Sequence, residues 1–311
     1  MTRPLLLVGQ PLLAPLLPLL RADHDVIALW EAHTPGDLAK VDALVWAGEF
    51  PLGRNLIDAM PRLRLIACFT VGYDGVDVAL ARERGIAVAH AGNANADDVA
   101  DHAIGLILAH RRWIVAGDRQ LRAGQWTIES KTRTRSMGGA QLGIVGMGAI
   151  GVAVAERARA MKMRIGWWGP RAKPNLSCPR ADSLEALARG SDILVIAARA
   201  DAHNRGMIDA RILDALGPDG LLVNVARGQL VDEVALVAAL RDGRLGGAAL
   251  DVFDPEPTDP SRWADIANVV LTPHVGGATH EAVGRMAQVL MANLAAHFAG
   301  EELPSPVPAD G

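Results

Sequence analysis

A glycine-rich turn between a strand-like run and a helix-like run constrains the fold of this chain more than any other feature. The segment GIVGMGAIG places Gly146, Gly148 and Gly151 in the pattern G-x-G-x-x-G, and VAVAERARAM follows it. The first glycine permits a tight turn, the second lets the backbone approach a pyrophosphate, and the third lets helix and strand pack closely. N–H groups at the helix start attract phosphate. The turn predicts a dinucleotide-binding α/β unit, and a purely structural glycine turn is the alternative.

The residues after the next predicted strand indicate which dinucleotide binds. Sites for NAD usually carry an acidic residue there, which accepts hydrogen bonds from the adenosine ribose. This chain has Gly169 instead, and then Pro170, Arg171 and Lys173. Cations favour a 2′-phosphate, so we expect NADP(H) as the cofactor, with NAD(H) bound more weakly. The alternative is that both cations are solvated surface residues, and Trp168 either stacks on adenine or caps the sheet.

Short apolar runs alternate with helix-length segments along the chain, which predicts parallel strands joined by helices. The strand candidates are residues 5–8, 43–48, 63–69, 85–91, 142–146, 163–168, 192–198, 220–226, 247–253 and 268–274. One long helical segment is expected over 97–124, and a C-terminal helix from about 279 to 299. We therefore expect an α/β fold of two Rossmann-like, doubly wound parallel-sheet domains with a cleft between them. The substrate domain is expected over 1–94 plus 279–311, and the NADP-binding domain over 95–278.

Composition narrows the classes of partner. A net charge of −4 and a pI near 6.1 argue against nucleic acid and membrane surfaces, and favour a small molecule. The leucine-rich start is interrupted by prolines and is expected to form strand, turn and short helix rather than a signal peptide. No apolar stretch of membrane-spanning length occurs elsewhere. The two cysteines, Cys68 and Cys178, have no metal-ligand spacing, so we expect no metal and a reducing cytoplasm.

Six segments together carry a resemblance to a known family. They are CFTVGYDGVD, GNANADDVADHAIGLILA, GIVGMGAIG, VNVARGQLVDEVAL, GGAALDVFDPEP and LTPHVGGAT, in this order along nearly the whole chain. The chain resembles the D-specific 2-hydroxyacid dehydrogenases, and within them the hydroxyphenylpyruvate reductase and glyoxylate/hydroxypyruvate reductase branch. The resemblance implies NADPH-dependent reduction of a 2-keto acid to the D-2-hydroxy acid, with hydroxyphenylpyruvate, glyoxylate or hydroxypyruvate as substrate. It also implies a homodimer.

The resemblance assigns three catalytic residues. It implies that Arg227 holds the substrate carboxylate and polarises the keto oxygen, that Glu256 orients the histidine, and that His274 is the general acid. The chemistry suits these residue types. A guanidinium can bridge a carboxylate and a keto oxygen with fixed, planar donors. A carboxylate beside an imidazole raises the pKa of the imidazole, so the acid form persists at neutral pH. Taken singly, each of the three residues also has a structural interpretation, as a strand cap, a surface acid or a core histidine.

Further contacts are implied residue by residue. Substrate contacts are expected at Val71, Gly72, Tyr73 and Trp46, although Trp46 could equally pack in the core. Cofactor contacts are expected at Gly146, Met147, Gly148, Ala149, Ile150, Gly151, Trp168, Gly169, Pro170, Arg171, Lys173, Val225, Ala226 and Asp251. The remaining histidines, including His102, are expected to be structural.

Three other functions are weighed against this one. A nucleotide-sensing regulator on the same fold would be expected to carry a partner-binding tail or an extra domain, whereas the motifs fill the chain; a partner-binding surface groove stays the open alternative. An NAD-dependent phosphoglycerate-type dehydrogenase would be expected to carry the missing ribose acid. Formate oxidation is disfavoured because Glu256, rather than glutamine, precedes Pro257.

Overall fold

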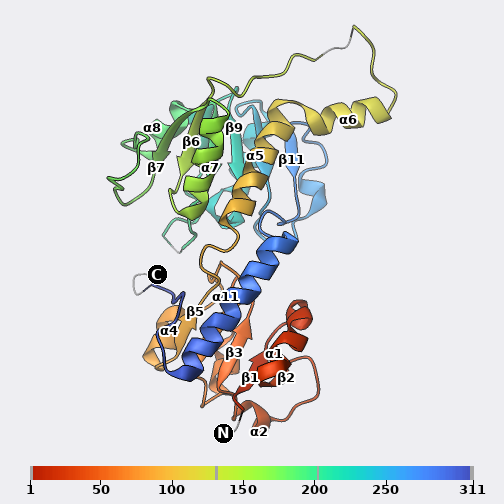
Figure 1. The fold of residues 1–311 in the computed structure, drawn as a ribbon. Coiled ribbons are helices and arrows are strands. Elements are labelled where there is room, and N and C mark those ends of the chain that lie inside the picture. Colours follow the sequence, from red (N-terminus) through yellow and green to blue (C-terminus); the bar gives the residue numbers. More distant parts are fainter. Residues whose placement is uncertain (1–2, 130–131, 202, 309–311) are drawn as a thin grey trace. The chain divides into compact units, whose positions relative to one another are not determined.

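The computed structural model describes residues 3–129, 132–201 and 203–308, which form two α/β units (Figure 1). The first unit comprises Met1–Asn95 and His280–Gly311, and the second comprises Ala96–Thr279. Each boundary lies one residue from the expected one: Asn95 belongs to the first unit and Thr279 to the second. The predicted class of two doubly wound, parallel-sheet α/β domains is confirmed.

The first unit is built on a five-stranded parallel sheet in the order β2-β1-β3-β4-β5. Its elements are β1 (Leu5–Val8), η1 (Pro11–Leu16), α1 (Leu17–Asp23), β2 (Asp25–Ala28), α2 (Pro35–Leu38), β3 (Ala43–Trp46), α3 (Arg54–Asp58), β4 (Leu65–Cys68), α4 (Val78–Glu83), β5 (Ala87–Ala89) and α11 (His280–Ala299). Successive strand residues alternate between two buried clusters. Leu6 packs with α1 and α11, whereas Leu7 packs with α3 and α4. The C-terminal helix thus returns to cover the first sheet, as expected.

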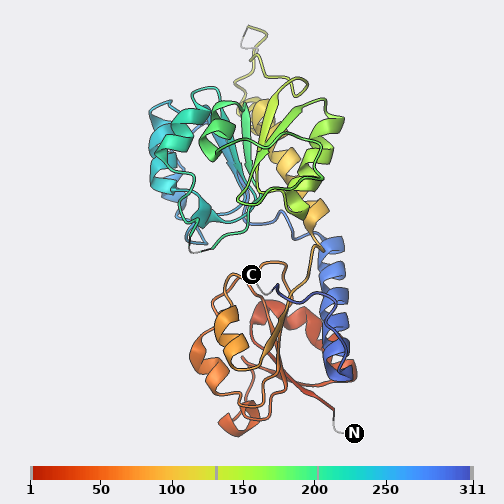
Figure 2. The ribbon, with the colours of Figure 1, turned by 90° about the vertical axis from the view of Figure 1, so that its left-hand side faces the viewer.

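The second unit contains a six-stranded parallel sheet in the order β11-β10-β9-β8-β6-β7. Its elements are α5 (Ala96–Arg111), α6 (Ile114–Arg122), β6 (Gln141–Val145), α7 (Ala149–Ala160), β7 (Arg164–Trp168), α8 (Leu184–Arg189), β8 (Ile193–Ile196), α9 (Ala210–Leu216), β9 (Leu221–Asn224), η2 (Gly228–Leu230), α10 (Glu233–Arg241), β10 (Gly247–Leu250), η3 (Pro260–Arg262) and β11 (Val269–Leu271). Helices α5 and α7 pack on one face and α8, α9 and α10 on the other, so the sheet is sandwiched (Figure 2).

Both sheets place the first strand of the unit between its second and third strands. In open α/β sheets, ligands bind beyond the carboxyl ends of the strands where the order reverses. In the second unit that point lies between β6 and β8, and the glycine-rich turn follows β6 directly. The strand order therefore agrees with the motif about where a nucleotide would bind.

Two details differ from expectation. The predicted helix over 97–124 is two helices, because Trp113 takes a left-handed conformation with φ 58° between α5 and α6. Strand β2 was not predicted, since its residues Asp25–Ala28 show neither a long apolar run nor a turn signal. Most predicted strands also extend too far at their carboxyl ends. There the last apolar residues of the predicted strand belong to the loop that follows the observed strand.

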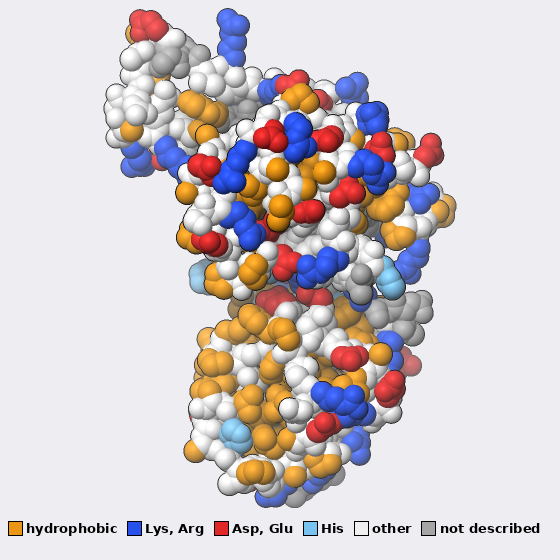
Figure 3. Space-filling view, turned by 180° about the vertical axis from the view of Figure 1, so that it is seen from behind, with side chains coloured by type: hydrophobic (Ala, Val, Ile, Leu, Met, Phe, Trp, Pro, Cys, Tyr) orange, Lys and Arg blue, Asp and Glu red, His pale blue; other side chains and the backbone are white. Residues whose placement is uncertain are grey.

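Over the described ranges, no helix is long and apolar enough to cross a membrane. No group of three or more potential metal ligands lies together in the same ranges. On the face drawn in Figure 3, positive and negative side chains are interspersed over the second unit rather than gathered into one basic field. This distribution gives no electrostatic footprint for nucleic acid on that face.

Candidate active site

The three glycines of the turn after β6 are required for different reasons. Gly146 has φ +90°, and a Cβ on it would lie 2.6 Å from the Cα of Ala198. A Cβ on Gly151 would lie 2.1 Å from the carbonyl oxygen of Gly146, so helix and strand touch there. A Cβ on Gly148 would meet no atom within 4 Å. The first and third glycines serve the packing of the chain, whereas the second leaves open space where a pyrophosphate would lie.

The start of α7 is arranged for an anion. Its N-cap is Gly148, which supplies no side-chain cap, and the first helical N–H bond runs from Val152 to the Gly148 carbonyl at 3.0 Å. The amides of Ala149 and Ile150 precede that bond and have no intrahelical acceptor. The residues of this turn therefore fit a dinucleotide phosphate, as predicted.

Cations surround the end of β7, where an NAD site would carry an acid. The Gly169 carbonyl accepts hydrogen bonds from Arg180 Nη2 at 2.7 Å and Nε at 3.2 Å. Lys173 Nζ donates to the Met147 carbonyl at 2.6 Å, which ties this segment to the glycine turn. Arg171 is exposed, and Trp168 is half-buried against the core. Arg180 belongs to no sequence motif, so no pattern in the sequence indicated it.

The turn after β9 presents Arg227. Asn224 is 1% exposed; its Nδ2 donates to the Arg227 carbonyl at 2.9 Å, and its Oδ1 accepts from the Ala226 amide at 3.1 Å. Arg227 Nη1 donates to the Ala226 carbonyl at 2.7 Å. The side chains of Val225 and Ala226 are buried, so any cofactor contact there falls chiefly to their backbone.

A buried carboxylate shapes the turn that carries His274. Asp251, 2% exposed, accepts hydrogen bonds from the Val275 amide at 3.0 Å and the Gly276 amide at 2.8 Å. His274 itself is left-handed, with φ 53°, and its amide donates to the Asp251 carbonyl at 2.8 Å. Within the chain, the Asp251 carboxylate accepts hydrogen bonds from the amides of this turn, which would otherwise lack an acceptor. Its expected contact with a cofactor stays a prediction.

Two further side chains complete the environment of Asp251. Its Oδ1 accepts from Thr272 Oγ1 at 2.6 Å and lies 3.2 Å from His102 Nε2. Burial alone would raise the pKa of Asp251, but the hydrogen bonds from His102, Thr272 and the two amides lower it to about 2. The carboxylate is thus ionised throughout the neutral range. The contacts of His102 with Thr272 and Asp251 are compatible with the structural role expected for it.

His274 and Glu256, for which the resemblance implies the roles of general acid and orienting carboxylate, lie in contact. His274 Nδ1 lies 2.7 Å from Glu256 Oε2, and Glu256 Oε1 accepts from the Phe253 amide at 2.9 Å. Burial opposes the charge of Glu256, but these hydrogen bonds and the nearby charges of His274 and Arg227 hold the pKa of the carboxyl below its ordinary value. Both side chains are about one-third exposed, which leaves the imidazole accessible to a reactant.

In the first unit, the loop after β4 exposes backbone amides. Thr70 Oγ1 accepts from the Gly48 amide and donates to the Gly72 carbonyl, both at 2.9 Å. The Val71 carbonyl is 3.0 Å from His90 Nδ1. With the two carbonyls engaged, the amides of Val71 and Gly72 donate to no acceptor among the described residues. This arrangement suits a bound carboxylate.

Trp46 does not line a site with its ring. The side chain is 7% exposed and belongs to the core cluster, and its Nε1 donates to the Phe50 carbonyl at 2.9 Å. A Cβ on Gly9 would lie 2.2 Å from the indole. The expectation that Trp46 contacts substrate is therefore corrected in favour of core packing, which the sequence left open.

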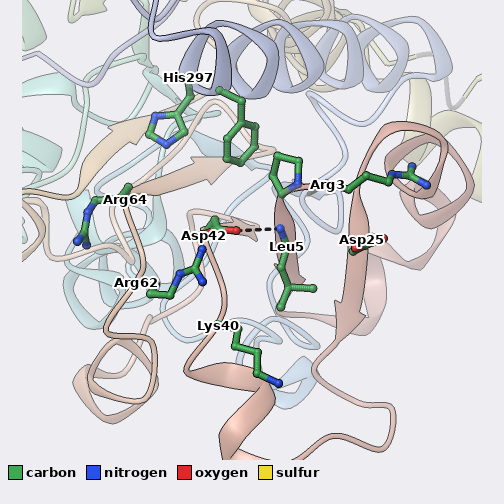
Figure 4. Close-up of a pocket in the computed structure, with 10 residues that line it drawn as sticks. Arg3, Leu5, Asp25, Lys40, Asp42, Arg62, Arg64 and His297 are labelled. Atoms are coloured by element: carbon green, nitrogen blue, oxygen red, sulfur yellow. Dashed lines mark hydrogen bonds and ion pairs between the residues drawn. The ribbon is translucent and has the colours of Figure 1, made fainter. Parts of the chain in front are cut away.

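A pocket elsewhere in the first unit lies at the opposite ends of the strands (Figure 4). Its central carboxylate, Asp42, accepts from the Leu5 amide at 3.0 Å and pairs with Arg62 at 2.7 Å. These bonds join the start of β1 to the segments that precede β3 and β4, at the amino-terminal ends of the strands. Because parallel α/β sheets bind ligands beyond their carboxyl ends, we assign this pocket no part in the chemistry.

Comparisons with known proteins agree with this geometry. Residues 104–276 match the family model described as "D-isomer specific 2-hydroxyacid dehydrogenase, NAD binding domain". A hydroxyphenylpyruvate reductase of Plectranthus scutellarioides is 45% identical over 253 residues, which cover 81% of each chain. A 2-ketogluconate reductase of Gluconobacter oxydans is 40% identical over 253 residues, 81% of this chain and 82% of that one.

Solved structures extend the likeness to the whole fold. An NADPH-dependent glyoxylate/hydroxypyruvate reductase from Sinorhizobium meliloti, in complex with NADP and malonate, has a TM-score of 0.91 at 35% identity. The match covers 98% of this chain and 97% of that one. The chain belongs to the D-isomer specific 2-hydroxyacid dehydrogenase family, and the resemblance noted in its sequence is confirmed.

The Asp251 carboxylate predicts a specific pH dependence of stability. Its pKa is about 2 in the folded chain against an ordinary value of 3.8, so it stabilises the fold above pH 4 and loses this effect as the pH falls towards 2. We expect Asp251→Asn to lower the free energy of unfolding at pH 7 by about 2 kcal/mol. Urea denaturation of both proteins between pH 7 and pH 3 measures the difference, which should shrink in acid. The exposed Asp182→Asn is the control, and a difference independent of pH would contradict the assignment.

Proposed function

We propose that this protein reduces a 2-keto acid to the D-2-hydroxy acid with NADPH. The observation that carries the proposal is the contact of His274 with Glu256 at 2.7 Å, close enough to Arg227 for the guanidinium to lower the pKa of the carboxyl. A proton donor and a cation next to it are what reduction of a keto acid requires from the protein. The relatives named as hydroxyphenylpyruvate, glyoxylate and hydroxypyruvate reductases support these compounds as candidate substrates.

The cofactor supplies the hydride when bound, and the protein supplies the proton and the charge. Arg227 binds the substrate carboxylate and polarises the keto oxygen, which a planar guanidinium can do with two parallel donors. His274 donates a proton to that oxygen. Glu256 holds the imidazole by Nδ1, which leaves Nε2 for the substrate, and it favours the protonated ring. Val71, Gly72 and Tyr73 of the first unit stay predicted substrate contacts.

The arrangement favours an enzyme over a nucleotide-sensing regulator, because a sensor has no need for a paired histidine and carboxylate. A phosphoglycerate-type dehydrogenase specific for NAD is disfavoured by the cationic end of β7, where Gly169 stands in place of the acid. The proposed cofactor contacts stay those predicted from the sequence: Gly146 to Gly151, Trp168, Gly169, Pro170, Arg171, Lys173, Val225, Ala226 and Asp251. The buried Val225 and Ala226 would contribute through their backbone.

The cofactor preference can be tested at Arg171. If its guanidinium binds the 2′-phosphate, one charge-assisted hydrogen bond is worth about 1.5–3 kcal/mol, or roughly a tenfold to hundredfold change in affinity. We expect Arg171→Ala to raise KM for NADPH by that factor and to leave KM for NADH nearly unchanged. Initial rates with both cofactors measure it. Arg189→Ala, on the exposed side of α8, should change neither, and equal effects on both cofactors would refute the assignment.

The reaction can be tested at its proton donor. Initial rates with glyoxylate, hydroxypyruvate, pyruvate and 4-hydroxyphenylpyruvate should show NADPH-dependent reduction that declines on the alkaline side as His274 loses its proton. We expect His274→Gln to lower kcat by roughly a hundredfold to ten-thousandfold and to remove this decline. Arg227→Ala should lower kcat/KM as well. Absence of turnover in the wild type despite NADPH binding would instead favour the regulator.

We further propose that the protein is a homodimer. Helix α6 projects from the second unit (Figure 1), and apolar side chains on it and just after it are exposed: Ile114 at 56%, Leu121 at 60%, Trp126 at 56% and Ile128 at 70%. Such a surface on a projecting segment is typical of an interface, and a second copy would bury it.

The mass of the protein, measured by light scattering as it elutes from a size-exclusion column, tests whether it is a dimer. The wild type should have twice the chain mass of 32.8 kDa, and Leu121→Glu combined with Trp126→Glu should have the mass of one chain. Trp30→Glu, at a tryptophan of the first unit that is 38% exposed, should stay dimeric. A wild type of single-chain mass would end the proposal.

A cytoplasmic location stays a prediction of the sequence.

A further inference from the structure

Glu233 opens α10, yet its carboxylate serves a different segment. The residue is 8% exposed. Its Oε1 accepts a hydrogen bond from the Asp254 amide at 2.7 Å, and its Oε2 pairs with Arg262 Nη1. The same Nη1 donates to the Asp254 carbonyl at 3.4 Å. Glu233 and Arg262 thus engage both backbone polar groups of Asp254.

This burial is not needed for the helix. An acid in the first turn interacts favourably with the helix dipole while it stays in water, and Asp232 already caps α10 by accepting from the Ala235 amide. Burying the Glu233 carboxylate costs desolvation free energy, and burial raises its pKa against the opposing effects of the Asp254 amide and Arg262. The compensating interactions are those with the segment around Asp254.

That segment carries Glu256. The Phe253 amide donates to Glu256 Oε1, and Glu256 Oε2 contacts His274 Nδ1, so residues 253–256 form a small closed turn with the catalytic carboxylate on it. Asp254 lies inside this turn. Fixing its amide and carbonyl therefore fixes where the turn places the carboxylate.

The same segment also touches the arginine loop. A Cβ on Gly228 would lie 1.9 Å from the carbonyl carbon of Phe253, so the backbones of the two loops are in direct contact. Gly228 follows Arg227 in the chain. A displacement of residues 253–254 would therefore disturb both the partner of His274 and the loop of the proposed substrate-binding guanidinium.

We propose that Glu233 and Arg262 are positioning residues that clamp the backbone of Asp254 and so hold Glu256 against His274. The catalytic importance of this clamp rests on the proposed function. Its effect on the contact between His274 and Glu256 does not depend on that function. Neither residue touches the reacting atoms. Loss of the clamp lets the carboxylate drift from Nδ1, and the imidazole then gives up its proton at a lower pH.

Several other charged groups lie near His274, and the experiment must separate their effects on its titration from the effect of the clamp. Glu256 and Arg227 face each other closely enough to interact, Asp254 pairs with Arg205 at 2.5 Å, and the turn under His274 contains Asp251 with His102 beside it. A variant at Glu233 leaves all of these side chains in place. Glu233→Ala and Glu233→Gln both remove one negative charge, so the difference between them isolates the part of the effect on His274 that passes through the position of residues 253–256.

The experiment follows the imidazole of His274 directly. Histidine-labelled protein is titrated by NMR, and the His274 signal is assigned by its loss in His274→Gln. Glu256→Gln sets the full effect of losing the carboxylate charge. We expect Glu233→Ala to move the His274 midpoint in the same direction by a smaller amount, about half a pH unit or more, and Glu233→Gln, which keeps an acceptor for the Asp254 amide, to move it less. Arg262→Met should resemble Glu233→Gln.

Glu185→Gln is the matched control, because Glu185 also pairs with two arginines, Arg189 and Arg211, at 2.7 Å each but lies on α8. It should leave the midpoint unchanged. In rate measurements, the alkaline limb of the kcat profile should move with the NMR midpoint, while NADPH affinity measured by fluorescence stays within about twofold. A lower melting temperature with an unchanged His274 midpoint would overturn the clamp. Absence of turnover in the wild type would overturn the proposed function alone, since the titration needs no activity.

Discussion

The buried carboxylate of Asp251 is the interaction on which the rest of the site depends. Without a partner, the amides of Val275 and Gly276 would be left unsatisfied beside β10, and nothing would compensate a left-handed residue at His274. Thr272 and His102 occupy further acceptor sites of the same carboxylate, which keeps it ionised and in one orientation. The backbone of His274 is therefore held by Asp251, and its side chain is held separately by the contact of Nδ1 with Glu256.

The glycine-rich turn separates what the fold needs from what a ligand needs. Gly146 and Gly151 are demanded by contacts within the chain, since any Cβ there would overlap backbone atoms. Gly148 has no such neighbour, so its lack of a side chain is unexplained by packing alone. A backbone that must approach a pyrophosphate explains it, and the uncapped start of α7 points the same way. Of the three glycines in this turn, Gly148 is the one whose missing side chain points to a ligand and not to packing.

The alternation of apolar runs predicted the fold class, and the family resemblance predicted that Glu256 lies against His274, as it does. Alternating apolar runs and short motifs at strand ends are enough to place Arg227, Glu256 and His274 on one edge of a sheet. The sequence could not predict the roles of Asp251, Glu233 or Arg180, because each depends on which distant backbone group a side chain meets. Trp46 shows the same limit, since an aromatic residue at a strand end reads alike whether it faces a ligand or the core. The break at Trp113 was missed because the apolar spacing continues across it.

The acid–base pair is held from both sides by groups that take no part in the reaction. On one side, Asp251 fixes the backbone of the histidine; on the other, the Phe253 amide and the Glu233–Arg262 pair fix the turn of the carboxylate. Asp251 and Glu233 each accept hydrogen bonds from backbone amides, which do not titrate in the working pH range. The short distance between His274 and Glu256 then depends on two rigid turns rather than on two flexible side chains. Because a hydrogen bond between charged partners weakens steeply as its geometry degrades, such rigidity would favour the protonated imidazole that the proposed reaction requires.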